Sequence, residues 1–274
     1  MKIVDIDKLF KEFVADYISK NKDNLKGDVE EQKEAVYDAF SKTTFDALGG
    51  KTPIDFYDDE KDKTVEILKE HFVKNVPVSE YLIDALISYA DEEELNTLIS
   101  DASDDDLLLI VIEVMIHKNS KIAVNGLIDL LFEGKRSKEV LDACVDYLSD
   151  KDVFDKINDY LSKENQVVTA QLCDLISRQK RHSYVMTKAL ETEFLNNPEK
   201  APEYCSYLVE YGDESVLQTL YEGLKKATDY VSTKEILIAI EALGGEADFN
   251  RDFSKDKDYI AIKEAQKNER KNNR

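Results

Sequence analysis

The sequence predicts an all-α protein, a solenoid of about five to six helix pairs preceded by an N-terminal helical region. Helix breakers are scarce, because the 274 residues include only 9 glycines and 4 prolines. Apolar residues recur at i, i+3, i+4 and i+7 along most of the chain, which is the buried stripe of a helix. From residue 79 onward these stripes also return at a regular interval. Short helices of this kind bury their apolar faces by stacking.

The N-terminal region, residues 1–76, is expected to contain three longer helices. Apolar residues at helical spacing predict the first from about Ile6 to Ile18 and the second from about Val29 to Leu48. The third is expected from about Asp59 to Asn75. This region differs from the rest of the chain, since it lacks the repeating stripe.

The glycine-rich segment after the second helix has the features of a helix boundary. Gly49-Gly50 stops one helix, and Thr52-Pro53 starts another as N-cap and first helical residue. A phosphate-binding loop is disfavoured, because the Walker spacing and a preceding strand are both missing. Pro77 closes the region, and Ser79 is expected to cap the next helix.

The interval between stripes is revealed by one column of apolar residues. Cys144 and Cys173 are 29 residues apart, and Cys173 and Cys205 are 32 apart. Steps of these sizes connect six apolar positions: Leu86, Met115, Cys144, Cys173, Cys205 and Leu237. We expect the six to be equivalent and buried, each on the first helix of a pair. Asp91, Asp150 and Asp213 stand at matching turns, where a carboxylate would accept backbone N–H groups of the second helix.

Two segments near the end of the repeating region resemble a known family. The stretch YGDESVLQTLYEGLK, from Tyr211, resembles the second half of a HEAT repeat, and IAIEALGG, from Ile238, is similar to the end of a first HEAT helix. The resemblance covers about residues 79–244 and concerns pattern, with no functional motif. It implies a right-handed α-α superhelix of the HEAT or armadillo type.

Three parts are expected along the chain. Residues 1–76 form the N-terminal helical region, and 77–245 the HEAT-like repeats. Residues 246–274 would hold a capping helix from about Ser254 to Lys267 and a frayed polar tail.

The charge balance limits the classes of partner. Asp and Glu number 58 against 37 Lys and Arg, which gives a net charge of −21. Nucleic-acid backbones and anionic membranes both require a positive surface, so neither is expected as a partner. A protein with a basic surface is favoured. The longest apolar run, Leu107 to Ile112, is too short to span a bilayer, and the N-terminus is not a secretory signal. A cytoplasmic location is expected.

Groups that could do chemistry each have a structural explanation. His71, His117 and His182 lack a His or Cys neighbour at metal-ligand spacing. The three cysteines fall in the apolar column, where a small core side chain is the simpler interpretation. The acidic run from Asp101 to Asp106 lacks the glycine and terminal Glu of a calcium loop. We therefore expect a protein that is not an enzyme and has no cofactor or metal site.

Two groups of residues are candidates for a protein interface. Tyrosine is enriched at interfaces, and the candidates are Tyr89, Tyr147 and Tyr211, near the ends of first helices, together with Tyr207. The alternative is that these rings cover the edges of the core. Arg178, Lys180 and Arg181 form a basic cluster within the repeats. They would contact an acidic group, or simply occupy a helix C-terminus, where cations are favoured.

The favoured function is a non-catalytic protein interaction or scaffold module, and the sequence does not specify its partner or oligomeric state. The alternative is a HEAT-like nucleic-acid-binding protein or an enzyme similar to the alkylpurine DNA glycosylases. That alternative requires a basic groove that holds a carboxylate. A third hypothesis assigns residues 1–76 the role of a regulatory subunit or a toxin–antitoxin-like partner.

Overall fold

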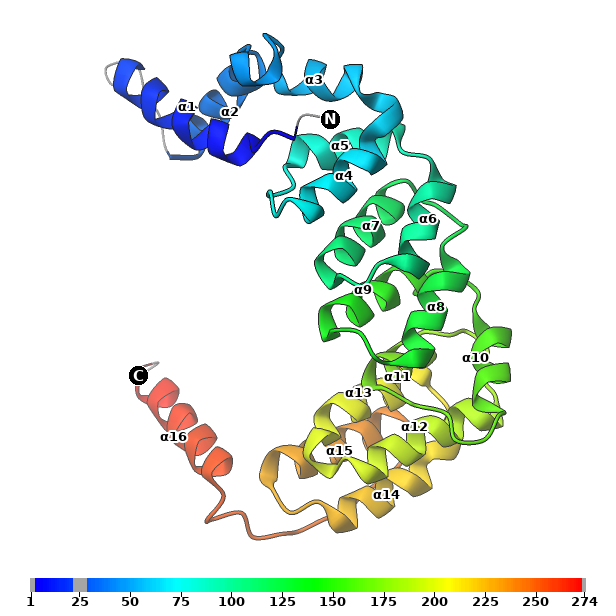
Figure 1. Ribbon diagram of the computed structural model, residues 1–274. Helices are drawn as coiled ribbons and strands as arrows, with labels where there is room; N and C mark the ends of the chain where they lie inside the picture. The colour runs from blue at the N-terminus through cyan, green and yellow to red at the C-terminus, as the bar shows by residue number, and fades with distance from the viewer. Residues whose placement is uncertain (1–2, 22–28, 273–274) are drawn as a thin grey trace. The chain divides into compact units, whose positions relative to one another are not determined.

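The structure is a computed structural model that describes residues 3–21 and 29–272 (Figure 1). These residues form helices and connecting loops, with an isolated bridge between Phe45 and Lys51. The predicted all-α class is therefore confirmed for the described part of the chain. The chain divides into two compact units, residues 1–126 and 127–274. This division falls inside the region that the sequence predicts to be repeats, and the boundaries near 76 and 245 remain predictions.

The first unit opens with α1 (Ile6–Asn21) and α2 (Val29–Ser41). The expectation that the second helix reaches Leu48 is wrong. The helix ends at Ser41, and just beyond it Thr43 Oγ1 donates to the Ala39 carbonyl oxygen at 2.8 Å. A 3-10 turn follows, and Gly49 closes it with a φ of 71°. The glycine stop therefore ends the turn rather than the helix.

The next two helices are α3 (Pro53–Asp59) and α4 (Thr64–Val73). Thr52 Oγ1 accepts the Asp55 N–H at 3.1 Å, which confirms the predicted N-cap. The helix predicted over Asp59–Asn75 is shorter than expected, because a 3-10 turn separates α3 from α4.

Four helices follow at the positions expected for the first two pairs: α5 (Glu80–Tyr89), α6 (Glu92–Asp101), α7 (Asp105–His117) and α8 (Val124–Glu133). Helices α5 and α6 both pack against α7. Ser79, Asp91 and Asp104 cap α5, α6 and α7 with side-chain oxygens that accept backbone N–H groups. The acidic run before α7 is thus a helix cap.

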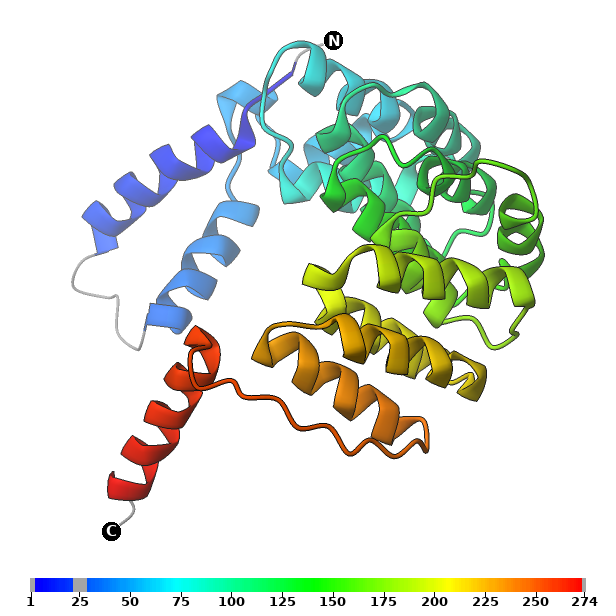
Figure 2. The same ribbon diagram turned by 90° about the horizontal axis from the view of Figure 1, so that it is seen from below.

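The second unit continues the alternation of first and second helices. Besides most of α8 and the C-terminal helix, this unit contains α9 (Lys138–Leu148), α10 (Phe154–Leu161), α11 (Ala170–Ser177), α12 (Tyr184–Asn196), α13 (Ala201–Tyr211), α14 (Leu217–Lys226) and α15 (Tyr230–Ala242). The first helices α9, α11, α13 and α15 contact one another in this order. The second helices α10, α12 and α14 do the same. Figure 2 shows the yellow to orange helices of this unit lying side by side.

The buried column is confirmed at five of its six positions. Leu86, Met115, Cys144 and Cys173 are fully buried, and Cys205 is buried as well. Leu237 is only half-buried, so the expectation that it is buried is wrong. In the described residues α15 is followed by the C-terminal helix and not by another first helix, and Leu237 keeps part of its surface exposed.

Two of the three predicted aspartate caps are found. Asp91 accepts the Glu93 N–H and Asp213 accepts the Ser215 N–H, each at 2.9 Å. The prediction for Asp150 is wrong, because α10 begins later than the matching turn suggested. Just before its start, Asp152 accepts the Phe154 N–H at 3.4 Å.

The C-terminal helix is α16 (Lys257–Asn272), where the sequence predicted Ser254–Lys267. Asp256 fixes its start, since one carboxylate oxygen accepts the Tyr259 N–H at 3.0 Å. The other oxygen accepts the Tyr230 N–H at 3.0 Å. One carboxylate thus joins the starts of α15 and α16. The predicted tail beyond Lys267 continues as helix to Asn272.

Candidate interaction surface

A row of acidic residues follows the first helices. The positions two residues before the buried column carry a carboxylate in five of six helices: Asp84, Glu113, Asp142, Gln171, Glu203 and Glu235. The first three are exposed and the last three are half-buried. Two residues correspond to about 200° around a helix, so side chains at this offset point away from the core. The register that builds the core therefore also repeats a carboxylate on the opposite side, and we call these positions the acidic row.

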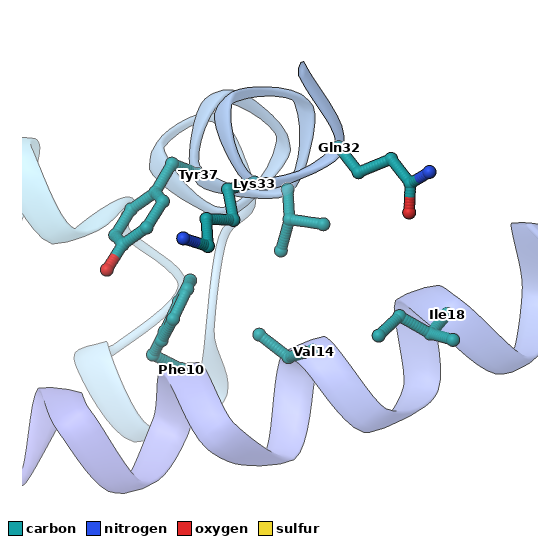
Figure 3. Close-up of a pocket in the computed structure, with 7 residues that line it drawn as sticks. Phe10, Val14, Ile18, Gln32, Lys33 and Tyr37 are labelled. Atoms are coloured by element: carbon teal, nitrogen blue, oxygen red, sulfur yellow. The ribbon is translucent and has the colours of Figure 1, made fainter. Parts of the chain in front are cut away.

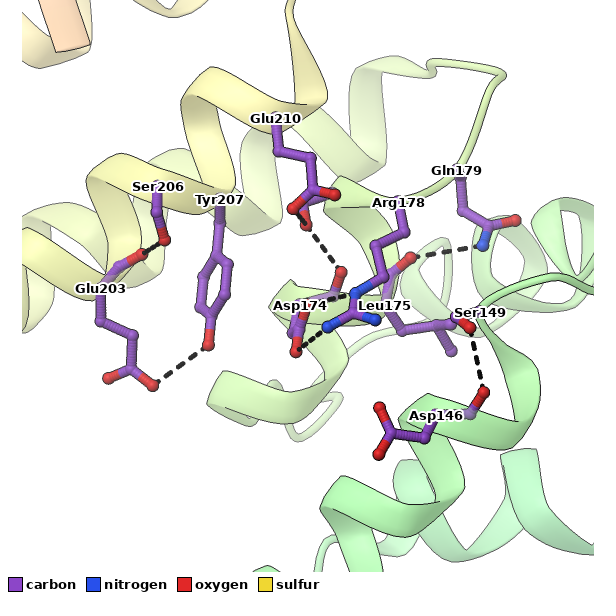
Figure 4. Close-up of polar contacts among 11 residues, drawn as sticks. Asp146, Ser149, Asp174, Leu175, Arg178, Gln179, Glu203, Ser206, Tyr207 and Glu210 are labelled. Atoms are coloured by element: carbon purple, nitrogen blue, oxygen red, sulfur yellow. Dashed lines mark hydrogen bonds and ion pairs between the residues drawn. The ribbon is translucent and has the colours of Figure 1, made fainter. Parts of the chain in front are cut away.

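Hydrogen bonds fix the acidic row in the second unit. Gln171 Nε2 donates to Asp142 Oδ1 at 2.9 Å, which connects α11 to α9. Tyr207 donates its hydroxyl hydrogen to Glu203 Oε1 at 3.1 Å, one turn along α13 (Figure 4). Burial, and then the charge of Glu203, raises the pKa of Tyr207. The hydroxyl therefore stays protonated and acts as a donor that orients the carboxylate.

The four candidate tyrosines separate into two pairs. Tyr89 is 43% exposed, and its hydroxyl donates to Asp58 Oδ1 at 2.8 Å. Tyr207 is half-buried beside the acidic row. Tyr147 and Tyr211 are buried, with 4% and 2% of their surface exposed. Only Tyr89 and Tyr207 reach the surface, and the other two cover the core as in the alternative interpretation.

The basic cluster lies in the loop between α11 and α12, and its three side chains are exposed. Arg178 Nε and Nη2 donate to the two carboxylate oxygens of Asp174 at 2.7 and 3.0 Å (Figure 4). Arg181 Nη2 donates to Asp155 Oδ1 at 3.2 Å. The hydrogen bond to Asp174 raises the pKa of Arg178. Arg178 is the C-cap residue of α11, as the helix-end interpretation predicts, whereas Lys180 and Arg181 lie beyond the helix.

The three histidines have different surroundings. His71 is buried, and its Nδ1 lies 2.8 Å from the Pro77 carbonyl oxygen. His117 ends α7, and the ring of His182 lies 4.1 Å from the ring of Tyr211. Among the described residues, no three His, Cys, Asp or Glu side chains gather in a way suited to hold a metal ion.

The three cysteines are free thiols inside the core. Burial raises the pKa of Cys144 and of Cys205 to about 12. Burial raises the pKa of Cys173 as well, and nearby carboxylates add to the effect. All three groups are therefore in the thiol form, which is a poor nucleophile and a poor metal ligand.

We expect the three thiols to resist alkylation or disulfide exchange in the folded protein. At about pH 8 a thiol with a pKa near 12 is ionised to about one part in ten thousand, and the core also excludes the reagent. Ellman's reagent, followed by absorbance, should label the thiols fully in concentrated urea and very slowly in buffer. Rapid native labelling of any of the three would show that its environment is more open.

An apolar groove lies between α1 and α2, and sequence reasoning did not anticipate it (Figure 3). Its volume is about 570 Å³, and its walls include Phe10, Val14, Val36 and Tyr37. Tyr37 remains 48% exposed. The sequence does contain a sign of the groove. The first helix carries more apolar residues than the second, so the narrow apolar stripe of the second helix cannot cover all of them.

We compared the chain with known protein families, with curated proteins and with solved structures, and none of the three comparisons finds a match. Of the helices that the structure describes, none combines the length and the apolar character that crossing a membrane requires. The similarity to HEAT repeats therefore remains a resemblance in pattern.

Proposed function

We propose that the chain from about residue 79 is a HEAT-like α-solenoid that binds a basic protein and carries out no catalysis. The acidic row is the observation that supports this function most directly. In the second unit the first helices α9, α11, α13 and α15 pack in order, and three of these four carry a carboxylate of the acidic row. Solenoids of this type commonly present one such extended face to their partners.

The spacing of the acidic row favours a regular partner. Packed helices lie about 8 to 10 Å apart, so acidic-row positions on successive first helices of the second unit are separated by about that distance. A partner helix advances about 10 Å in seven residues. A helix with Lys or Arg at every seventh position would place its cations opposite successive carboxylates. The net charge of −21 would add long-range attraction for the same partner.

The proposal predicts a loss of affinity when the acidic row is neutralised. The probe is a helical peptide with Lys at every seventh position, labelled for fluorescence anisotropy. In the second unit, the triple variant Asp142→Asn, Glu203→Gln and Glu235→Gln should weaken binding about tenfold, since each charge pair contributes about 0.5 kcal/mol. The loss should shrink as salt is raised, because exposed charges are screened.

A matched control removes the same number of charges elsewhere on the second unit. Asp159→Asn, Glu164→Gln and Glu222→Gln involve exposed residues outside the first helices. This triple variant should bind the peptide almost as tightly as the unmodified protein. Equal losses in the two triple variants would mean that net charge, and not the acidic row, attracts the peptide.

The nucleic-acid alternative finds no support on this face. A phosphate backbone requires a row of cations, and every charged residue at the acidic-row positions is a carboxylate.

A further inference from the structure

A second feature of the second unit has the opposite charge character. A pocket of about 550 Å³ opens where the loop after α9 meets the loop after α11. One loop contributes Lys151, and the other contributes Arg178, Lys180 and Arg181. Two carboxylates, Asp150 and Asp152, also line the wall. The wall therefore carries four cations and two anions in a chain whose net charge is −21.

The cations retain donors that are available to a ligand. A guanidinium has five N–H donors. Arg178 uses two of them on Asp174, and Arg181 uses one on Asp155. Lys180 makes no hydrogen bond or ion pair with any residue that the structure describes. The pocket thus offers at least one unengaged ammonium and two partly engaged guanidinium groups.

The two arginines are held in place before any ligand arrives. The guanidinium of Arg181 lies over the ring of Phe154, 3.9 Å from its centre. Arg178 is fixed by the paired bonds to Asp174, beside Ser149 and Gln179 on the pocket wall (Figure 4). Groups that are already ordered lose little conformational entropy when a ligand binds.

The dipole of α11 does not explain this arrangement. A helix C-terminus favours cations in its last turn, which accounts for Arg178 alone. Lys151 comes from a different loop, and Lys180 and Arg181 lie past the helix end. Three of the four cations already have a carboxylate partner, Asp150 for Lys151, Asp174 for Arg178 and Asp155 for Arg181. Lys180 is the cation of this wall that has none among the described residues.

We propose that this pocket binds a phosphate monoester, with the dianion among Lys180, Arg178 and Arg181. The donors that remain come from three side chains, which suits the several oxygens of a phosphate better than a single carboxylate. Arginine also recognises phosphate oxygens through paired N–H donors. The volume lies in the range of small-molecule pockets, about 300 to 1,000 Å³, and so has room for more than a phosphate ion. The ester is either a small metabolite or a phosphorylated side chain of another protein.

Isothermal titration at about 150 mM salt tests the proposal with three probes: inorganic phosphate, a hexose phosphate and a phosphoserine peptide. We expect saturable binding of one ester per chain and no binding of the unphosphorylated sugar or peptide. Lys180→Glu should weaken it about tenfold or more, because a hydrogen bond to a charged group is lost. Lys156→Glu, at an exposed site on α10 outside the pocket, makes the same charge change and should leave the affinity nearly unchanged.

The outcomes separate the two sources of the ester. Tighter binding of the hexose phosphate assigns the pocket to a small molecule, and tighter binding of the peptide assigns it to a phosphorylated protein. Binding should also weaken below about pH 6, where the ester becomes a monoanion. The proposal is overturned if no probe binds saturably, or if Lys180→Glu and Lys156→Glu bind the ester equally well.

Discussion

A Leu208→Ala variant is expected to lose about 2 to 5 kcal/mol of its free energy of unfolding. Leu208 is fully buried on α13, a first helix that packs against α11, α12 and α15. Removal of the isobutyl group therefore leaves a cavity in the core against which α13 packs. Urea unfolding followed by far-ultraviolet circular dichroism would measure the loss.

The control is the same substitution at Leu237 on α15, where the side chain is only half-buried. Its loss should be nearer about 1 kcal/mol, since much of the side chain already contacts water. Equal losses of unfolding free energy in the two variants would show that burial does not determine how much each leucine of the first helices contributes to stability.

A Gly223→Ala variant is expected to be destabilised by about 1 to 3 kcal/mol, the opposite of the usual effect. Replacing glycine by alanine inside a helix normally stabilises by about 1 kcal/mol. Here the added Cβ would lie 2.4 Å from two ring atoms of Phe194. That ring belongs to α12, which packs against α14, and it is itself buried. The ring therefore has little room to move, and the thermal midpoint should fall.

A double-mutant cycle identifies the cause. Phe194→Leu removes the ring atoms that the new methyl group would meet, so it should be much less harmful in the Gly223→Ala background than alone. We expect a coupling free energy of about 1 kcal/mol or more between the two sites. If the stability losses of the two single variants simply add in the double variant, the strain comes from other contacts of α14 and not from the Phe194 ring.

The core was predictable because its buried positions recur at a regular interval along the chain. Helical periodicity identifies the buried side of each first helix, and the repeat interval transfers that assignment from one pair to the next. The failures occur where the pattern lacks information. Leu237 lies on the last first helix, which is followed by α16 and not by another first helix of the series. Asp150 precedes a turn whose length the apolar stripe does not specify. Likewise, the apolar residues predicted for the second helix continue to Leu48 and do not indicate that the helix ends at Ser41.

The surface features were present in the sequence in a less obvious form. The acidic row has the same interval as the buried column but an offset of two residues. Lys151 and Lys180 are 29 residues apart, so they occupy equivalent places after successive first helices. The basic pocket follows only when those helices pack side by side, which periodicity within one helix cannot show. The apolar groove beside Val14 likewise depends on how two helices of unequal apolar width meet.

The hydrogen bonds between helix pairs have a consequence for how the chain folds. Gln171 bonds to Asp142 across 29 residues, Thr219 to Glu191 across 28, and Ser177 to Glu210 across 33. Each bond closes a loop about one pair long, so the entropy lost in forming it is modest. Chains dominated by such near contacts fold rapidly and can nucleate at several places. During synthesis on the ribosome, each pair can dock as soon as the next has emerged, without waiting for the C-terminus.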